Sequence, residues 1–105
     1  GEFNYLISKY AHLADLLRVE ARQHLLSILS FVYRIQGKYS QALDCCHKSL
    51  ELAKFLPKID HDLFLRQRNL LIVLYERVGK SELAKTTAEQ TLSTLINASI
   101  DYVYN

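Results

Sequence analysis

The residues best suited to chemistry are the adjacent cysteines Cys45 and Cys46, which are followed directly by His47. Thiolates and imidazoles bind zinc, and thiols also carry redox chemistry. Neighbouring side chains on one helix, however, point about 100° apart, so these two thiols cannot close a normal disulfide and the trio cannot aim at one ion. We therefore predict that Cys46 is a small core residue and that both thiols stay reduced, as is usual in an intracellular protein.

The other candidates for catalysis or ligand binding are isolated from one another. His12, His24 and His61 have no second histidine at i,i+4, and no acidic residue completes a metal-binding motif with any of them. The Gly-Lys pairs at 37–38 and 79–80 lack the spaced glycines and the strand context of a phosphate-binding loop. No nucleophile has a base and an orienting group at an interpretable spacing. We predict no catalytic residue, no metal and no cofactor, and hence no enzyme.

Composition bounds the class of protein. The 105 residues, half of them apolar, are enough for one domain with a core, and we expect residues 1–3 to be a cloning scar and 4–105 the single domain. A net charge of +2 is too small and scattered for a nucleic-acid footprint, and no apolar run reaches the roughly 18 residues of a membrane span. We predict a cytoplasmic protein whose partners are neither nucleic acid nor membrane.

Hydrophobic periodicity predicts helices throughout the chain. Segment 4–17 is one-faced, and its stripe consists of Leu6, Tyr10, Leu13 and Leu17. Segment 18–23 is polar enough for a turn, although a continuous helix stays open. Up to residue 36 the apolar residues surround the next helix, so we expect it to be covered on more than one flank.

Turn residues predict where the later helices begin and end. Gly37 and Gly79 supply the left-handed backbone that ends a helix. Ser40, Asp60 and Ser81 are expected to cap the helices that follow. Pro57 separates a one-faced helix over 40–55 from a second helix that is apolar all round.

These elements form an internal repeat. The stretch at 31–43, FVYRIQGKYSQAL, returns 42 residues later at 73–85 as VLYERVGKSELAK. Each copy contains a helix, a tight turn and a second helix. The fold class is therefore all-α, a stack of antiparallel helical hairpins with about five helices: a flanking helix over 4–17, one repeat over 19–55, a second over 60–96 and an extension of the last helix over 97–105.

The repeat resembles a known family. Tyr33, Gly37, Tyr39 and Ala42 in the first copy, and Leu71, Tyr75, Gly79 and Ala84 in the second, stand at the spacing of the tetratricopeptide repeat. The 42-residue period and the stretch at 60–84 are similar to the long-helix variety found in kinesin light chains.

This resemblance implies a module that binds a peptide or partner helix, as a scaffold or adaptor, in a groove lined by the inner helices. Carried over residue by residue, the groove consists of His24, Ser27, Ile28, Phe31, Arg34, Arg66, Asn69, Leu70, Val73 and Arg77. The Lys and Asn clamp of chaperone-binding members is absent, because Ser27 and Phe31 stand where it would begin. The alternative is that neighbouring helices, or further repeats, bury the apolar groove residues Phe31, Ile28, Leu70 and Val73.

The last helix supports a second hypothesis, self-assembly of a homodimer or association with adjoining repeats. Its apolar residues continue beyond the second copy of the repeat, where no inner helix is left to cover them. The expected self-association residues are Leu92, Leu95, Ile96, Ile100 and Val103.

Overall fold

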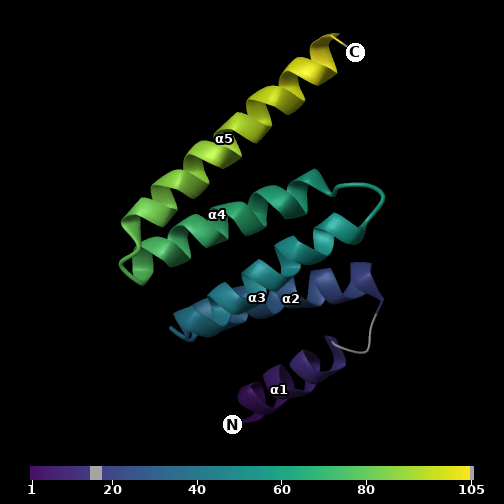
Figure 1. Ribbon diagram of the computed structural model, residues 1–105. Helices are drawn as coiled ribbons and strands as arrows, with labels where there is room; N and C mark the ends of the chain where they lie inside the picture. Colours follow the sequence, from purple (N-terminus) through teal and green to yellow (C-terminus); the bar gives the residue numbers. More distant parts are fainter. Residues whose placement is uncertain (15–17, 105) are drawn as a thin grey trace.

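The chain forms five α-helices and one short 3₁₀ turn, as described by a computed structural model that covers the backbone of residues 1–14 and 18–104 and the side chains of 1–11 and 18–103. The helices are α1 (Glu2–Ala14), α2 (Val19–Ile35), α3 (Tyr39–Leu52), α4 (His61–Arg77) and α5 (Ser81–Tyr104), with the 3₁₀ turn η1 (Ala53–Phe55) after α3. Figure 1 shows them stacked one after another along the molecule. The all-α prediction is confirmed.

Two glycine turns close the hairpins. Gly37 joins α2 to α3 with φ of 74°, and Gly79 joins α4 to α5 with φ of 78°. In both turns the N–H of the residue after the glycine donates a hydrogen bond to a carbonyl in the preceding helix. Lys38 N–H donates to the Tyr33 carbonyl at 2.9 Å, and Lys80 N–H donates to the Tyr75 carbonyl at 2.8 Å. The predicted left-handed glycines are therefore confirmed.

Helix starts agree less closely with the sequence-based expectations. Asp60 caps α4 as predicted, since its Oδ1 accepts a hydrogen bond from the Leu63 N–H at 3.1 Å. Ser40 does not cap α3, which begins at Tyr39 after Lys38, and Ser81 is already the first residue of α5. The turn expected over 18–23 is also wrong, because Arg18 is extended and α2 begins at Val19.

The core has two apolar clusters. One joins the two hairpins through Ala42 and Cys46 of α3 and Leu70, Leu71 and Leu74 of α4. The other holds α1 against the first hairpin.

In that second cluster the buried residue of α1 is Ile7, packed with Leu26, Leu29 and Cys45. The predicted stripe of α1 is therefore wrong where the structure describes it, because Leu6 is half-buried and Tyr10 is exposed. Leu13 and Leu17 lie outside the residues whose side chains are described. Glu2 and Phe3, set aside as part of a cloning scar, are the first residues of α1.

Polar side chains join the helices where the sequence suggested only apolar packing. The Gln67 Nε2 of α4 donates to Ser27 Oγ of α2 at 2.7 Å. Gln23 and Ser49 exchange two side-chain-to-carbonyl hydrogen bonds of 3.3 Å between α2 and α3. All four residues are buried, so their hydrogen bonds are needed to offset the loss of water.

As far as its side chains are described (81–103), all buried residues of helix α5 lie in its first half. Its last buried residue is Thr91, whose hydroxyl accepts a hydrogen bond from Arg68 Nε at 3.0 Å. Every residue from 92 to 103 is exposed. Figure 1 shows α5 diverging from α4 beyond the Gly79 turn, so its second half projects from the stack.

Candidate functional site

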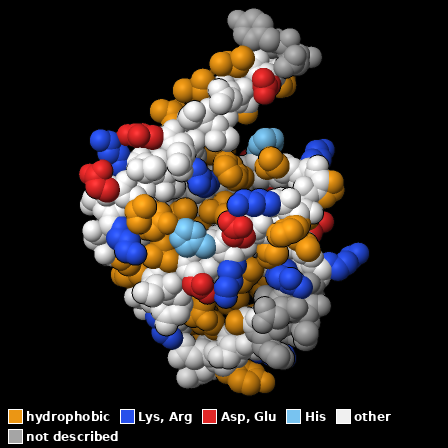
Figure 2. Space-filling model, viewed as in Figure 1, with side chains coloured by type: hydrophobic (Ala, Val, Ile, Leu, Met, Phe, Trp, Pro, Cys, Tyr) orange, Lys and Arg blue, Asp and Glu red, His pale blue; other side chains and the backbone are white. Residues whose placement is uncertain are grey.

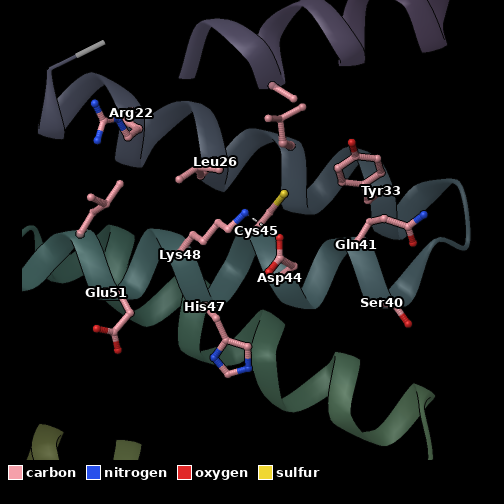
Figure 3. A pocket seen from close by; sticks show the side chains of 13 residues that line it. Arg22, Leu26, Tyr33, Ser40, Gln41, Asp44, Cys45, His47, Lys48 and Glu51 are labelled. Atoms are coloured by element: carbon pink, nitrogen blue, oxygen red, sulfur yellow. Dashed lines mark ion pairs between the residues drawn. The ribbon is translucent and has the colours of Figure 1, made fainter. Parts of the chain in front are cut away.

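The adjacent residues Cys45, Cys46 and His47 point to three different places. Cys45 faces α2 at a hollow of about 780 Å³ between α1, α2 and α3, while His47 points away toward α4 (Figure 3). The Cys46 thiol reaches the Gln67 carbonyl of α4 at 3.1 Å, and His47 Nε2 lies 3.0 Å from the Tyr75 hydroxyl. The trio therefore cannot share one ion.

Burial also makes these thiols poor nucleophiles. It raises the pKa of Cys45 to about 11, with a smaller contribution from the Asp44 carboxylate, and raises the pKa of Cys46 to about 12. Both are free cysteines, and Cys46 is completely buried, as predicted for a core residue. Among the described residues, no group of three or more His, Cys, Asp or Glu side chains could hold a metal ion.

A small hollow lies between α2 and α4, the helices predicted to be the inner pair. Its volume is about 210 Å³, and we call it the inner hollow. Six of the ten predicted groove residues line it: Phe31, Arg34, Arg66, Asn69, Leu70 and Val73. Two helices separated by 25 residues of sequence thus bring these side chains to one place.

The other four predicted groove residues lie elsewhere. Ser27 is buried beneath the surface, where its hydroxyl accepts the hydrogen bond from Gln67. His24 lines a separate hollow beside the loop that contains Pro57. Ile28 and Arg77 are exposed on α2 and α4 but do not line the inner hollow.

The inner hollow combines an apolar floor with positive charge. Leu70 is buried and forms part of the floor, while Phe31 remains 36% exposed. Arg34 and Arg66 contribute two guanidinium groups, and within the described part of the chain neither forms an ion pair. Arg66 Nε donates to the Asp62 carbonyl at 3.4 Å, which ties its side chain to its own helix.

An apolar row on α2 leads away from the inner hollow. Ile28, Phe31 and Ile35 follow at helical steps of three and four, and Ile28 and Ile35 are 59% and 78% exposed. This flank of α2 is therefore open, although the helix is covered on more than one flank, as expected, by α1, α3 and α4. The alternative that neighbouring helices bury the apolar groove residues holds for Leu70, which is buried, and does not hold for Ile28.

The predicted self-association residues lie on the projecting half of α5. Leu92, Leu95, Ile96, Ile100 and Val103 are between 39% and 70% exposed. Figure 2 shows hydrophobic side chains following one edge of the projecting helix. Together with Ser99, these five residues form what we call the α5 stripe.

Sequence reasoning missed a third surface, on the face that carries α3 and α5. A hollow of about 490 Å³ runs between these helices over α4, and it is lined among others by His47, Phe64, Arg68 and Tyr75. The Arg68 guanidinium lies 5.6 Å from the centre of the Phe64 ring, and the His47 and Tyr75 rings are 5.9 Å apart. The amphipathic pattern of each helix gave no signal of this hollow, because it depends on the divergence of α5.

Comparison with known proteins identifies the repeat. The family model for the tetratricopeptide repeat matches residues 20–97, about three quarters of the chain. No curated protein and no solved structure gives a match. Repeats of this family generally mediate interactions between proteins and are typically non-catalytic. Within the described residues, no helix is both long enough and apolar enough to cross a membrane. From α2 to beyond the middle of α5, the chain belongs to the tetratricopeptide repeat family.

Proposed function

We propose that this chain is a scaffold or adaptor module that binds a peptide or helical segment of a partner protein at the inner hollow and along the α2 row beside it. The observation that carries the proposal is the convergence of Phe31, Arg34, Arg66 and Val73, from two helices, on one hollow with an apolar floor. Exposed apolar side chains surrounded by polar groups are typical of interaction sites.

The size of the inner hollow favours a protein ligand over a small molecule. Pockets for small molecules usually enclose about 300–1,000 Å³, whereas this hollow measures about 210 Å³. That space suits one or two apolar side chains of a partner. The exposed row of Ile28, Phe31 and Ile35 extends the contact along α2, as a segment lying in a groove requires.

Charge adds a preference to this shape. Arg34 and Arg66 stand at the inner hollow without a carboxylate partner among the described residues. A carboxylate on the partner, next to an apolar side chain, would form charge-assisted hydrogen bonds with either guanidinium. The free thiols of Cys45 and Cys46 favour a partner in the reducing cytoplasm.

The test is a double substitution in the inner hollow. Phe31→Ala with Arg66→Ala removes one aromatic and one cationic side chain, and the affinity for the partner should fall by more than about 1–2 kcal/mol, or roughly tenfold. The matched control is Phe55→Ala with Lys85→Ala, which removes the same types of side chain from exposed positions outside the hollow.

All three proteins are used first to capture partners from a cell lysate, and then to measure affinity for each captured protein by calorimetry. Circular dichroism checks that the helices are intact. A partner that binds the parent and the control equally, but the hollow variant at least tenfold more weakly, supports the proposal. Equal affinity for all three proteins with an intact fold would exclude the inner hollow as the binding site.

The α5 stripe favours a second candidate function, self-assembly. Five large aliphatic side chains stay exposed on a helix that projects from the stack, and burying them in a dimer removes them from water. Light scattering at about 100 μM should then give twice the mass of the 12.2 kDa chain. A monomer at that concentration would exclude this function and leave the inner hollow proposal untouched.

A further inference from the structure

The α5 stripe has the geometry of a receptor for another helix. Residues at i, i+3, i+4 and i+7 of a helix surround a hole that accepts a side chain of a facing helix. The stripe contains two such sets, Leu92, Leu95, Ile96 and Ser99, and Ile96, Ser99, Ile100 and Val103. A hollow of about 370 Å³ lies over the same stretch, lined by Leu95, Ile96, Ser99, Ile100 and Val103. Ser99 is the one small residue in it.

The spacing of the stripe is the same in both directions. Its steps are three, one, three, one and three, so a two-fold axis between Asn97 and Ala98 maps the stripe onto itself. In an antiparallel pair of α5 helices about that axis, Leu92 faces Val103, Leu95 faces Ile100, and Ile96 faces Ser99 of the second copy. The large Ile96 then meets the small Ser99 at the centre, where the two helices come closest.

The charge pattern suits a second copy as the occupant. No charged residue occurs from Gln90 to Ile100, where α5 carries Ala98 and otherwise only Ser, Thr, Asn and Gln around the stripe, and Asp101 is the one charged residue before the stripe ends at Val103. Two copies therefore meet without like charges facing each other. A strongly charged partner would find no complementary charge in this stretch.

The exposed area is sufficient for a weak dimer. The exposed fractions of the five aliphatic side chains correspond to roughly 500 Å² per copy, which is large for an apolar patch on a monomer. Two copies bury about 1,000 Å², the lower limit for a specific interface.

We propose that this chain forms a two-fold symmetric dimer in which the projecting halves of α5 pair antiparallel, with Ile96 of each copy seated over Ser99 of the other. The proposal rests on the self-assembly function and specifies its partner, orientation and register. It is independent of partner binding at the inner hollow, because the two surfaces share no residue.

The first measurement compares two aspartate substitutions at neighbouring exposed positions. Ile96→Asp places a charge in the centre of the α5 stripe, and Asn97→Asp places the same charge beside it. Analytical ultracentrifugation from about 5 to 200 μM should show dimers for the parent and Asn97→Asp, and a monomer for Ile96→Asp. All these side chains are exposed in the single chain, so circular dichroism should be unchanged.

The second measurement tests the register by exchanging the large and small residues. Ser99→Ile overfills the crossing and should weaken the dimer at least about tenfold, as overpacking does in cores. The double variant Ile96→Ser with Ser99→Ile restores the opposition of large and small side chains and should recover the dimer. In a parallel pair, by contrast, Ser99 would face Ser99, and Ser99→Ile would strengthen association.

The outcomes separate the two proposals. If the parent chain is a monomer at 200 μM, both the self-assembly function and this inference are overturned. The α5 stripe would then be a binding site for a helix of a different protein. A dimer that survives Ile96→Asp, or that Ser99→Ile strengthens, keeps self-assembly but overturns the antiparallel register.

Discussion

The contact between Ser27 and Gln67 offers the sharpest test of how the inner helices are joined. Gln67 is completely buried, and its Nε2 donates to the Ser27 hydroxyl across α2 and α4 at 2.7 Å. Ser27→Ala leaves the Gln67 amide without this partner, and Gln67→Leu leaves the Ser27 hydroxyl without it. Each single change should lower the free energy of unfolding by about 1–3 kcal/mol, which is the usual penalty for a buried polar group that loses its partner.

The double variant should lose much less than the sum of the single changes. Replacing both partners by apolar groups of similar shape is often nearly neutral, because no buried polar group is left unpaired. The Ser30 hydroxyl keeps its hydrogen bond to the Ser27 carbonyl at 2.6 Å, and its longer contact with Gln67 Oε1 at 3.5 Å is lost equally in both variants that carry Gln67→Leu. We therefore expect a coupling energy of about 1–3 kcal/mol between positions 27 and 67.

Urea unfolding followed by circular dichroism measures all four free energies. The control pair is Ser27→Ala with Gln90→Leu, which changes an exposed glutamine on α5 and should be additive. Additivity of Ser27→Ala with Gln67→Leu, within about 0.3 kcal/mol, would refute the buried hydrogen bond.

Two further predictions concern the first hairpin. Gly37→Val should lower stability by about 1–2 kcal/mol, and Gly37→Asn by less, because φ is 74° and no atom lies within 4 Å of an added Cβ; equal melting temperatures for the parent and Gly37→Val would mean that the turn is misplaced. The thiols of Cys45 and Cys46, whose pKa values are raised to about 11 and about 12, should resist iodoacetamide at pH 8 until the protein unfolds. Thiols in the unfolded chain ionise near pH 9, whereas the buried thiols stay protonated up to about pH 11–12. The contribution of the two protonated thiols to the free energy of unfolding should therefore be complete below pH 9 and decline between pH 9 and about pH 11–12. The double variant Cys45→Ser/Cys46→Ala should not show this decline.

The repeat, the two hairpin turns and the start of α4 could be predicted from sequence because each has a local cause. Gly37 and Gly79 mark positions where only a left-handed residue fits, and Asp60 is a strong capping residue directly after Pro57. Ser40 failed as a cap because the helix begins one residue earlier, and capping preference alone does not fix a helix start to one residue.

The buried polar residues could not be predicted in the same way. Ser27 and Gln67 look like surface residues on a helical pattern, and only the crossing of α2 with α4 shows that each satisfies the other. The divergence of α5 is also a tertiary effect. Ser30 is completely buried in the first hairpin, whereas the equivalent position in the second carries the larger Ile72, which is half-buried. We expect a larger side chain at this position to favour wider separation of α4 and α5.

The inner hollow and the α5 stripe lie on different helices, so one protein molecule can use both. A dimer paired through α5 would carry two inner hollows, one on the α2 and α4 helices of each copy. A partner with two suitable segments would then bind the second hollow at a high effective concentration, and its apparent affinity would exceed that of a single segment. Ile96→Asp should remove this gain while leaving the affinity for a single segment unchanged. Phe31→Ala with Arg66→Ala should weaken both one-segment and two-segment partners, so titrating the two kinds of partner against these variants separates assembly from recognition.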